Sequence, residues 1–200
     1  MDSLILALIM GLALLSMPVA VHLMHRFGKR TTFIGCTAVW AIDCILLSLI
    51  PAGGQNWVLL LAVLTGLVYG ASSAVPWAML ADVMEQDELN SGKRREGSYA
   101  GYMVFFRKLA SALAIFLVGQ ALALSGFQEG TGIATGPVVQ PASAVFTLRL
   151  LIGVVAPVGM TLAALVALRY PLTRVSHIAL RSQLAVQRAA IMAERNGEQP

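Results

Sequence analysis

Long apolar stretches alternate with polar connections along this chain, and the pattern predicts helices that cross a membrane. Each apolar stretch holds roughly 20 residues or more, which is the length of α-helix needed to cross a hydrocarbon core of about 30 Å. A soluble protein with a buried core is the alternative, but five such stretches joined mostly by short polar turns are not typical of one. We therefore expect an all-α membrane protein with five transmembrane helices, at about 3–24, 31–50, 57–81, 99–125 and 144–168.

Composition and the placement of basic residues support this expectation and predict an orientation. Hydrophobic residues make up 58% of the chain and charged residues 12%, whereas a soluble domain carries about twice that charge. Lysine and arginine accumulate in the cytoplasmic connections of membrane proteins. Here they lie in alternate connections and in the C-terminal tail, at Arg26, Lys29, Arg30, Lys93, Arg94, Arg95, Arg174, Arg181, Arg188 and Arg195. We expect a multi-pass protein of the inner or plasma membrane, with its N-terminus outside and its C-terminus in the cytoplasm.

The sequence gives no sign of nucleic-acid binding or of enzyme chemistry. The net charge of +4 follows from the topology, and no basic patch with aromatic or helical readers indicates a nucleic-acid partner. The sequence also lacks a nucleophile–base pair, a cluster of metal ligands and a phosphate-binding loop. We therefore expect neither an enzyme nor a metal site.

Several residues inside the apolar stretches indicate a functional site or close helix packing. Asp43 is an acid embedded in the second stretch, and an intramembrane carboxylate indicates a functional site by default. It lies within about two turns of the outer end, so a carboxylate that reaches the outer interface, or one that is protonated, is an equal alternative. In the third stretch, Gly66 and Gly70 form a face of small residues that favours close packing of another helix, and Pro76 is expected to interrupt this stretch.

A block of acids and bases follows the third apolar stretch. It contains Asp82, Glu85, Asp87, Glu88, Lys93, Arg94, Arg95 and Glu96. One interpretation is a solvated loop whose ion pairs contribute roughly 0 to 1 kcal/mol each. The other is a cytoplasmic gate, in which the charges pair in one conformation of a moving protein and exchange partners in another.

Lys108 lies well inside the fourth apolar stretch, about ten residues past the loop and so about 15 Å deep along the helix axis. A lysine near the middle of a bilayer costs roughly 2.5 to 3.5 kcal/mol. Arg107 points about 100° away from Lys108 on a helix, so the two cations have different surroundings. We expect Lys108 to face a polar pathway.

Two runs of sequence in this region are specific to one family. PWAMLADVMEQDELNSGKRREGSYAG at 76–101 and FFRKLASALA at 105–114, with the later TLRLLIG and LRYPLTR, resemble the C-terminal half of a glycoside, pentoside and hexuronide:cation symporter. This is the melibiose-carrier family of the major facilitator superfamily. The resemblance implies twelve transmembrane helices in two bundles, of which the five here are similar to helices eight to twelve. It also implies symport of a sugar or sugar-like solute with Na⁺ or H⁺.

The resemblance also implies roles for individual residues. Lys108 matches the lysine that the family places at the central cavity, and the candidate cavity residues are Lys108, Tyr69, Ser73, Trp77 and Tyr102. Asp82, Arg94 and Glu96 match its cytoplasmic charged network, and the candidate gate residues are Asp82, Asp87, Glu88, Arg94, Arg95 and Glu96. The short turn after the first stretch resembles the interhelical loop signature of the superfamily, carried by Arg26, Gly28, Lys29 and Arg30.

The expected organisation is a partial C-terminal transmembrane bundle at 1–170 and a cytoplasmic tail at 171–200, where arginines repeated every seven residues predict an amphipathic helix. No cofactor is expected, and the coupling Na⁺ or H⁺ is expected to bind mainly in the N-terminal half that this sequence does not contain. The expected partners are membrane lipid, a small sugar-like solute, and the missing N-terminal bundle or a second chain. A half-carrier that works with a second chain and a non-transporting membrane subunit or remnant are the alternatives.

Overall fold

The structure is a computed structural model that describes residues 2–51, 54–128, 140–170, 183 and 186. Its elements are α1 (Asp2–Phe27), α2 (Lys29–Leu49), α3 (Gln55–Ser91), α4 (Glu96–Leu124), α5 (Ala142–Leu150), a π-helical turn η1 (Leu151–Val155) and α6 (Ala156–Leu168). No strand occurs in this part of the chain. Because α5, η1 and α6 form one continuous rod, the described residues form five helical segments that are long and apolar enough to cross a membrane. This confirms the expected all-α fold class.

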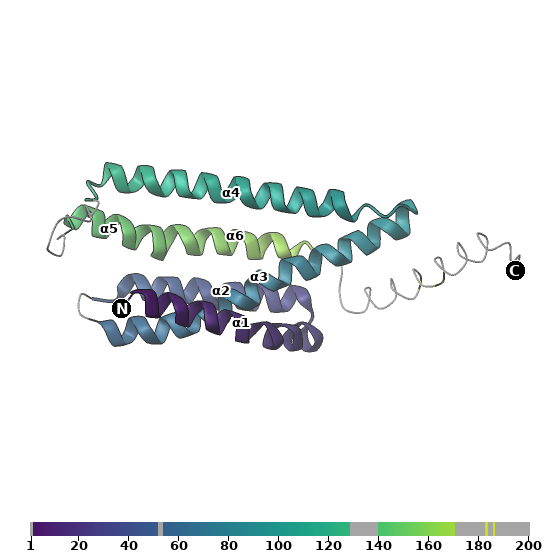
Figure 1. Ribbon diagram of the computed structural model, residues 1–200, viewed down its shortest axis with the longest axis horizontal. Coiled ribbons are helices and arrows are strands. Elements are labelled where there is room, and N and C mark those ends of the chain that lie inside the picture. Colours follow the sequence, from purple (N-terminus) through teal and green to yellow (C-terminus); the bar gives the residue numbers. More distant parts are fainter. Residues whose placement is uncertain (1, 52–53, 129–139, 171–182, 184–185, 187–200) are drawn as a thin grey trace, which may run out of the picture.

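The helices run side by side in an elongated bundle (Figure 1). α4 lies at one side next to the α5–α6 rod, and α1, α2 and α3 lie on the other side of that rod. α2 packs against α3 and α6, and α1 packs against α3. The tail at 171–200 lies outside the described residues except for 183 and 186, so the amphipathic helix expected there stays a prediction.

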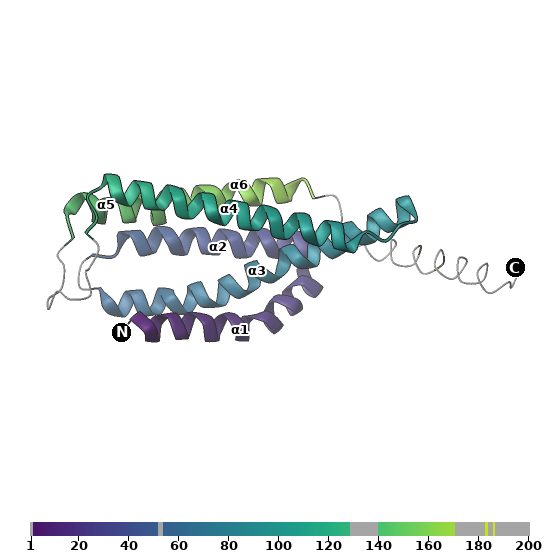
Figure 2. The ribbon, with the colours of Figure 1, turned by 45° about the horizontal axis from the view of Figure 1, so that its top comes forward.

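The close contact between α1 and α3 depends on the two glycines that the sequence indicated (Figure 2). A Cβ atom at Gly66 would lie 2.9 Å from the carbonyl oxygen of Ile9. A Cβ atom at Gly70 would collide with the carbonyl oxygen of Ala13 and with Ser16 Oγ. Only glycine therefore lets the two backbones approach this closely, and the predicted packing face is confirmed.

We expect Gly70→Ala to lower the free energy of unfolding by about 1 to 3 kcal/mol, the usual range for overpacking. The contact partner is largely backbone, which cannot move aside as a flexible side chain can. The matched control is Gly119→Ala in α4, where a Cβ atom would meet nothing within 4 Å and better helix propensity adds slight stability. Thermal unfolding in detergent measures both variants, and equal effects at the two positions would contradict the close packing.

α3 is longer than the apolar pattern predicted. It continues through Pro76 without a break and ends at Ser91, ten residues beyond the expected end at 81. A proline is tolerated in a membrane helix where neighbouring groups satisfy the freed carbonyl. Gly92 ends the helix in the left-handed conformation, with φ 66°, and its N–H donates to the Glu88 carbonyl. The acids therefore belong to the last turns of α3, and this part of α3 projects beyond the other described helices (Figures 1 and 2).

The last transmembrane rod contains an irregular turn before its proline. The Ala156 N–H donates to the Leu151 carbonyl, five residues back, instead of the usual four. Pro157 has no N–H to donate, and its ring crowds the carbonyl of Gly153, so the regular pattern cannot continue there. Gly153 also packs so closely on Ser48 of α2 that a Cβ atom would collide with the serine side chain.

Candidate functional site

Asp82 is the centre of a buried polar cluster at the end of the bundle where α2 begins. It lies on α3 and is 3% exposed. Lys29, the first residue of α2, donates from Nζ to Asp82 Oδ1 at 2.5 Å and to the Ala78 carbonyl at 2.9 Å. The ion pair therefore ties the start of α2 to α3. Gly28, with φ 86°, provides the tight turn that brings Lys29 back against the bundle.

Tyr170 adds the last transmembrane rod to this cluster. Its hydroxyl lies 3.1 Å from Asp82 Oδ2 and 3.2 Å from the Met79 carbonyl oxygen. Burial raises the pKa of Tyr170, and the nearby negative charge of Asp82 raises it further. The hydroxyl thus stays protonated at neutral pH and donates to the acid. Asp82 thereby connects α2, α3 and the residues that follow α6.

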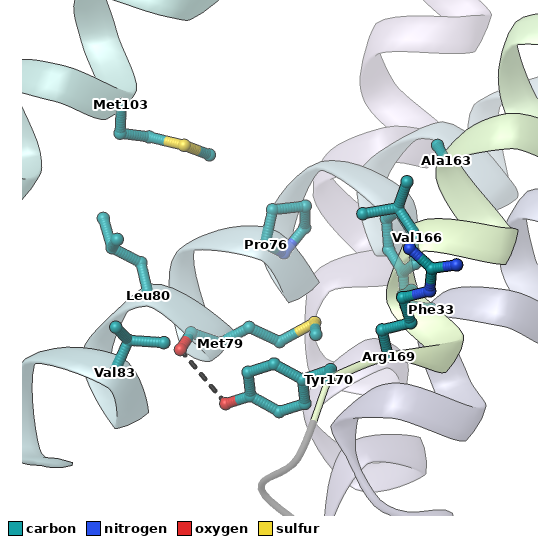
Figure 3. Close-up of a pocket in the computed structure, with 11 residues that line it drawn as sticks. Phe33, Pro76, Met79, Leu80, Val83, Met103, Ala163, Val166, Arg169 and Tyr170 are labelled. Atoms are coloured by element: carbon teal, nitrogen blue, oxygen red, sulfur yellow. Dashed lines mark hydrogen bonds between the residues drawn. The ribbon is translucent and has the colours of Figure 1, made fainter.

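A pocket of about 660 Å³ lies beside this cluster (Figure 3). Its walls come from α2, α3, α4 and the end of the last rod, and nearly all are apolar. The lining residues are Phe33, Pro76, Met79, Leu80, Val83, Met103, Ala163, Val166, Ala167, Arg169 and Tyr170. Figure 3 shows the Tyr170 hydroxyl directed toward the Met79 backbone, whereas the Arg169 side chain extends the other way, beside Val166 and Phe33. The pocket can hold an apolar group, with the Arg169 side chain as a polar group in its wall.

The five candidate cavity residues do not line this pocket. Tyr69 is half-buried, and its ring packs edge-to-face on Trp40 with centroids 5.6 Å apart. Ser73 is also half-buried, whereas Trp77 is 39% exposed and Tyr102 is 65% exposed. Lys108 is exposed on α4, and no hydrogen-bond or ion-pair partner for it is found within the described ranges. The role of these residues in solute binding stays a prediction.

The candidate gate residues divide into two groups. Asp82 is buried against Lys29, so the structure links the gate to the interhelical loop motif. Arg94 Nη2 pairs with Glu96 Oε1 at 2.7 Å, and both side chains are more than half exposed. Asp87 and Glu88 are half-buried in the last turns of α3, and Arg95 is exposed just before α4. In the loop motif, Arg26 lies over the Phe27 ring at 5.4 Å and Arg30 is half-buried.

Sequence reasoning did not identify Tyr170 as a site residue, nor the apolar wall that α3 contributes to the pocket. Pro76, Met79, Leu80 and Val83 follow one another at intervals of three, one and three residues, which places them on one face of α3. That spacing is a usable signal, but an apolar face in a membrane protein is equally suited to contact lipid. Tyr170 directly follows an arginine at the end of the last rod, where a tyrosine also serves as an interfacial anchor.

Comparison with known proteins identifies the family of this chain. The family model described as MFS/sugar transport protein matches residues 2–174. The chain belongs to this family. It is 33% identical over 177 residues to an uncharacterized symporter of Synechocystis, with 88% of the chain covered, and 31% identical over 172 residues to the sodium-dependent lysophosphatidylcholine symporter 1-A of Danio rerio, with 84% covered.

A sphingosine-1-phosphate transporter of Mus musculus is 29% identical over 178 residues, which cover 88% of the chain. The matches span about a third of the length of these family members: 32%, 31% and 34%. Family membership and the five apolar helices establish an integral multi-pass membrane protein related to symporters. The relatives are named as transporters, in agreement with the expectation that the chain is not an enzyme.

Proposed function

We propose that this chain provides C-terminal helices of a cation-coupled symporter, and that the pocket beside the Asp82 cluster is part of its solute pathway. The observation that carries the proposal is the pocket of about 660 Å³ between α2, α3, α4 and the end of the last rod. Its volume is in the usual range for small-molecule sites. Transporters of this kind bind solute between helical bundles, and the exposed face of α4, on which no residue is buried, is available to such a partner bundle.

The solute is proposed to be sugar-like or amphiphilic. The family description supports a sugar. The apolar pocket walls, with the Arg169 side chain among them, favour an amphiphile with an apolar chain and an anionic or zwitterionic head. Two relatives are named for a lysophosphatidylcholine and for sphingosine-1-phosphate. Na⁺ or H⁺ is the proposed coupling ion, because one relative is named as sodium-dependent and others as symporters.

Uptake into proteoliposomes tests this proposal. The chain is reconstituted alone and together with the N-terminal bundle of the Synechocystis symporter, and labelled methyl glycosides and lysophosphatidylcholine are offered under a Na⁺ gradient, a pH gradient or neither. Gradient-dependent uptake with the second bundle supports the proposal. Uptake by the chain alone supports the half-carrier alternative, and no uptake of any solute in either preparation would contradict both and favour a non-transporting subunit.

A bulky side chain in the pocket tests whether the pocket lies on the solute pathway. We expect Met79→Trp to reduce uptake of an amphiphile at least tenfold, because the indole ring occupies the space that the apolar chain needs. Leu165→Trp is the matched control, since Leu165 is 53% exposed on α6 and does not line the pocket. Equal uptake by the two variants would remove this pocket from the solute pathway.

A further inference from the structure

Asp43 is buried inside the membrane-spanning part of α2, away from the proposed solute pathway. It is 0% exposed. It lies six residues before Leu49, so about 9 Å from that end of a helix whose length matches the hydrocarbon core. Within the described ranges, the ion pairs are Lys29–Asp82 and Arg94–Glu96, and neither includes Asp43. No cation in this part of the chain therefore compensates a negative charge at Asp43.

The hydrogen bonds around Thr65 determine where the protons lie. Thr65 Oγ1, on the facing helix α3, is 2.5 Å from Asp43 Oδ2 and 3.0 Å from the Leu61 carbonyl oxygen. A threonine hydroxyl has one proton to donate, and a carbonyl oxygen or an ionised carboxylate can only accept. If Asp43 is ionised, Thr65 must share its one proton between the two oxygens, whereas protonation of Asp43 on Oδ2 lets both contacts be full two-centre hydrogen bonds. Asp43 then donates to Thr65, and Thr65 donates to Leu61.

The second oxygen of Asp43 leads to the same conclusion. Asp43 Oδ1 is buried and has no hydrogen-bond partner in the part of the chain that the structure describes. A buried carboxylate with one unpaired oxygen and no counter-ion costs several kcal/mol. The carbonyl oxygen of a neutral acid costs much less, because it carries no net charge. Protonation thus removes the largest unfavourable contribution at this site.

The titratable groups on the surrounding helices do not change the preference of Asp43 for its protonated form. α2 packs against α1, α3, α5, η1 and α6, and the last two contain no charged residue. Arg149 of α5 donates to the Ile50 carbonyl at 3.0 Å, at the end of α2. Cys44 adjoins Asp43 on its own helix, and Tyr69 lies one turn beyond Thr65 with its ring on Trp40. The charged groups of α1 and α3 lie toward the helix ends, at Asp2, His22, His25, Arg26, Asp82, Glu85, Asp87 and Glu88.

We propose that Asp43 is a proton-binding site within the bundle, at which one proton is held on Oδ2 and shared with Thr65 at neutral pH. The ligand is H⁺ taken from water, and binding converts the carboxylate into a neutral acid with no other bond made or broken. The site lies on α2 and α3 and does not use the residues of the solute pocket. It does not rest on the proposed transport function, because it concerns the protonation state of the resting protein.

Infrared difference spectroscopy of the full chain in lipid bilayers at neutral pH tests the proposal. The wild-type protein is expected to show the C=O stretching band of a protonated carboxyl group, which moves when water is exchanged for D₂O. This band is expected to be lost completely from the spectrum of Asp43→Asn. Glu96→Gln, which alters an exposed acid, is the control and is expected to keep it. Loss of an ionised-carboxylate band from Asp43→Asn, with the protonated band unchanged, would overturn the proposal.

A second variant keeps the test decisive if Asp43→Asn fails to fold. Thr65→Val has nearly the same shape as threonine but removes the acceptor of the Asp43 proton. The carboxyl band is then expected to remain and to move to higher frequency, because its hydrogen bond is lost. Thr65→Ser, which keeps the hydroxyl, is expected to leave the frequency close to that of the wild type. An unchanged band in Thr65→Val would show that Asp43 does not donate to Thr65.

Discussion

Replacement of Asp82 by alanine is expected to lower the free energy of unfolding by about 2 kcal/mol. Removal of one partner from a fully buried ion pair costs roughly 3 to 5 kcal/mol, and the effect is smaller here because the Lys29 side chain is 27% exposed. The variant leaves the Lys29 ammonium group with the Ala78 carbonyl as its hydrogen-bond partner among the described residues, and it removes one acceptor of the Tyr170 hydroxyl. Thermal or denaturant unfolding in detergent measures the change.

Two controls show whether burial of the charge is the cause. Glu96→Gln breaks an exposed ion pair and is expected to cost less than about 1 kcal/mol. The double variant Lys29→Met with Asp82→Leu removes both charges and is expected to be more stable than Asp82→Ala, because no unpaired charge remains. If Asp82→Ala were as stable as Glu96→Gln, the ion pair at 2.5 Å would not hold α2 against α3.

Replacement of Lys108 by alanine is expected to abolish solute uptake and leave the amount of protein in the membrane unchanged or higher. Lys108 lies twelve residues into α4, about 18 Å from its start, where a lysine costs roughly 2.5 to 3.5 kcal/mol. No hydrogen-bond or ion-pair partner for it occurs among the residues that the structure describes. The cost of this charge is therefore offset outside the described helices, by water, solute or a partner bundle.

The measurement is uptake in the two-bundle proteoliposomes, normalised to the protein inserted. Lys108→Arg keeps the charge and is expected to retain part of the activity, whereas Lys93→Ala, in the exposed α3–α4 connection, is expected to transport normally. Wild-type uptake by Lys108→Ala would remove this residue from the solute site. A parallel loss of inserted protein would instead indicate a role in assembly.

The sequence was sufficient to predict the membrane-spanning helices, because membrane insertion depends on the length and apolar character of a segment, and both can be counted along the chain. It also predicted the packing face of α3, since Gly66 and Gly70 leave a flat surface, but not that α1 is the helix that packs there. It did not predict the pair between Lys29 and Asp82, which are 53 positions apart. Both residues were candidates, but their pairing depends on how α2 lies against α3, and the pattern of either helix alone does not specify that.

The sequence did not predict the pocket, for a related reason. Met79, Leu80 and Val83 have the same apolar character whether they face lipid, another helix or a solute. A polar or amphipathic side chain in an apolar helix indicates a cavity, so Tyr69, Ser73 and Trp77 were candidate cavity residues. None of them lines the pocket. In the part of the chain that the structure describes, the pocket is recognisable only once the packing of four elements is known.

The π-helical turn at Leu151–Val155 has a consequence for how the pocket can change between relatives. Because the turn takes up one additional residue, the positions after it are out of phase by about 100° with the repeat that an uninterrupted α-helix would give them. Ala163, Val166 and Ala167 face the pocket in that shifted phase. Deletion of one residue within the turn would therefore restore the α-helical repeat and keep the same side chains at the pocket, whereas a single-residue insertion that the turn does not absorb would rotate the helix after it and present a different set of side chains there. Selectivity in such a rod can diverge through the phase of the helix as well as through substitution.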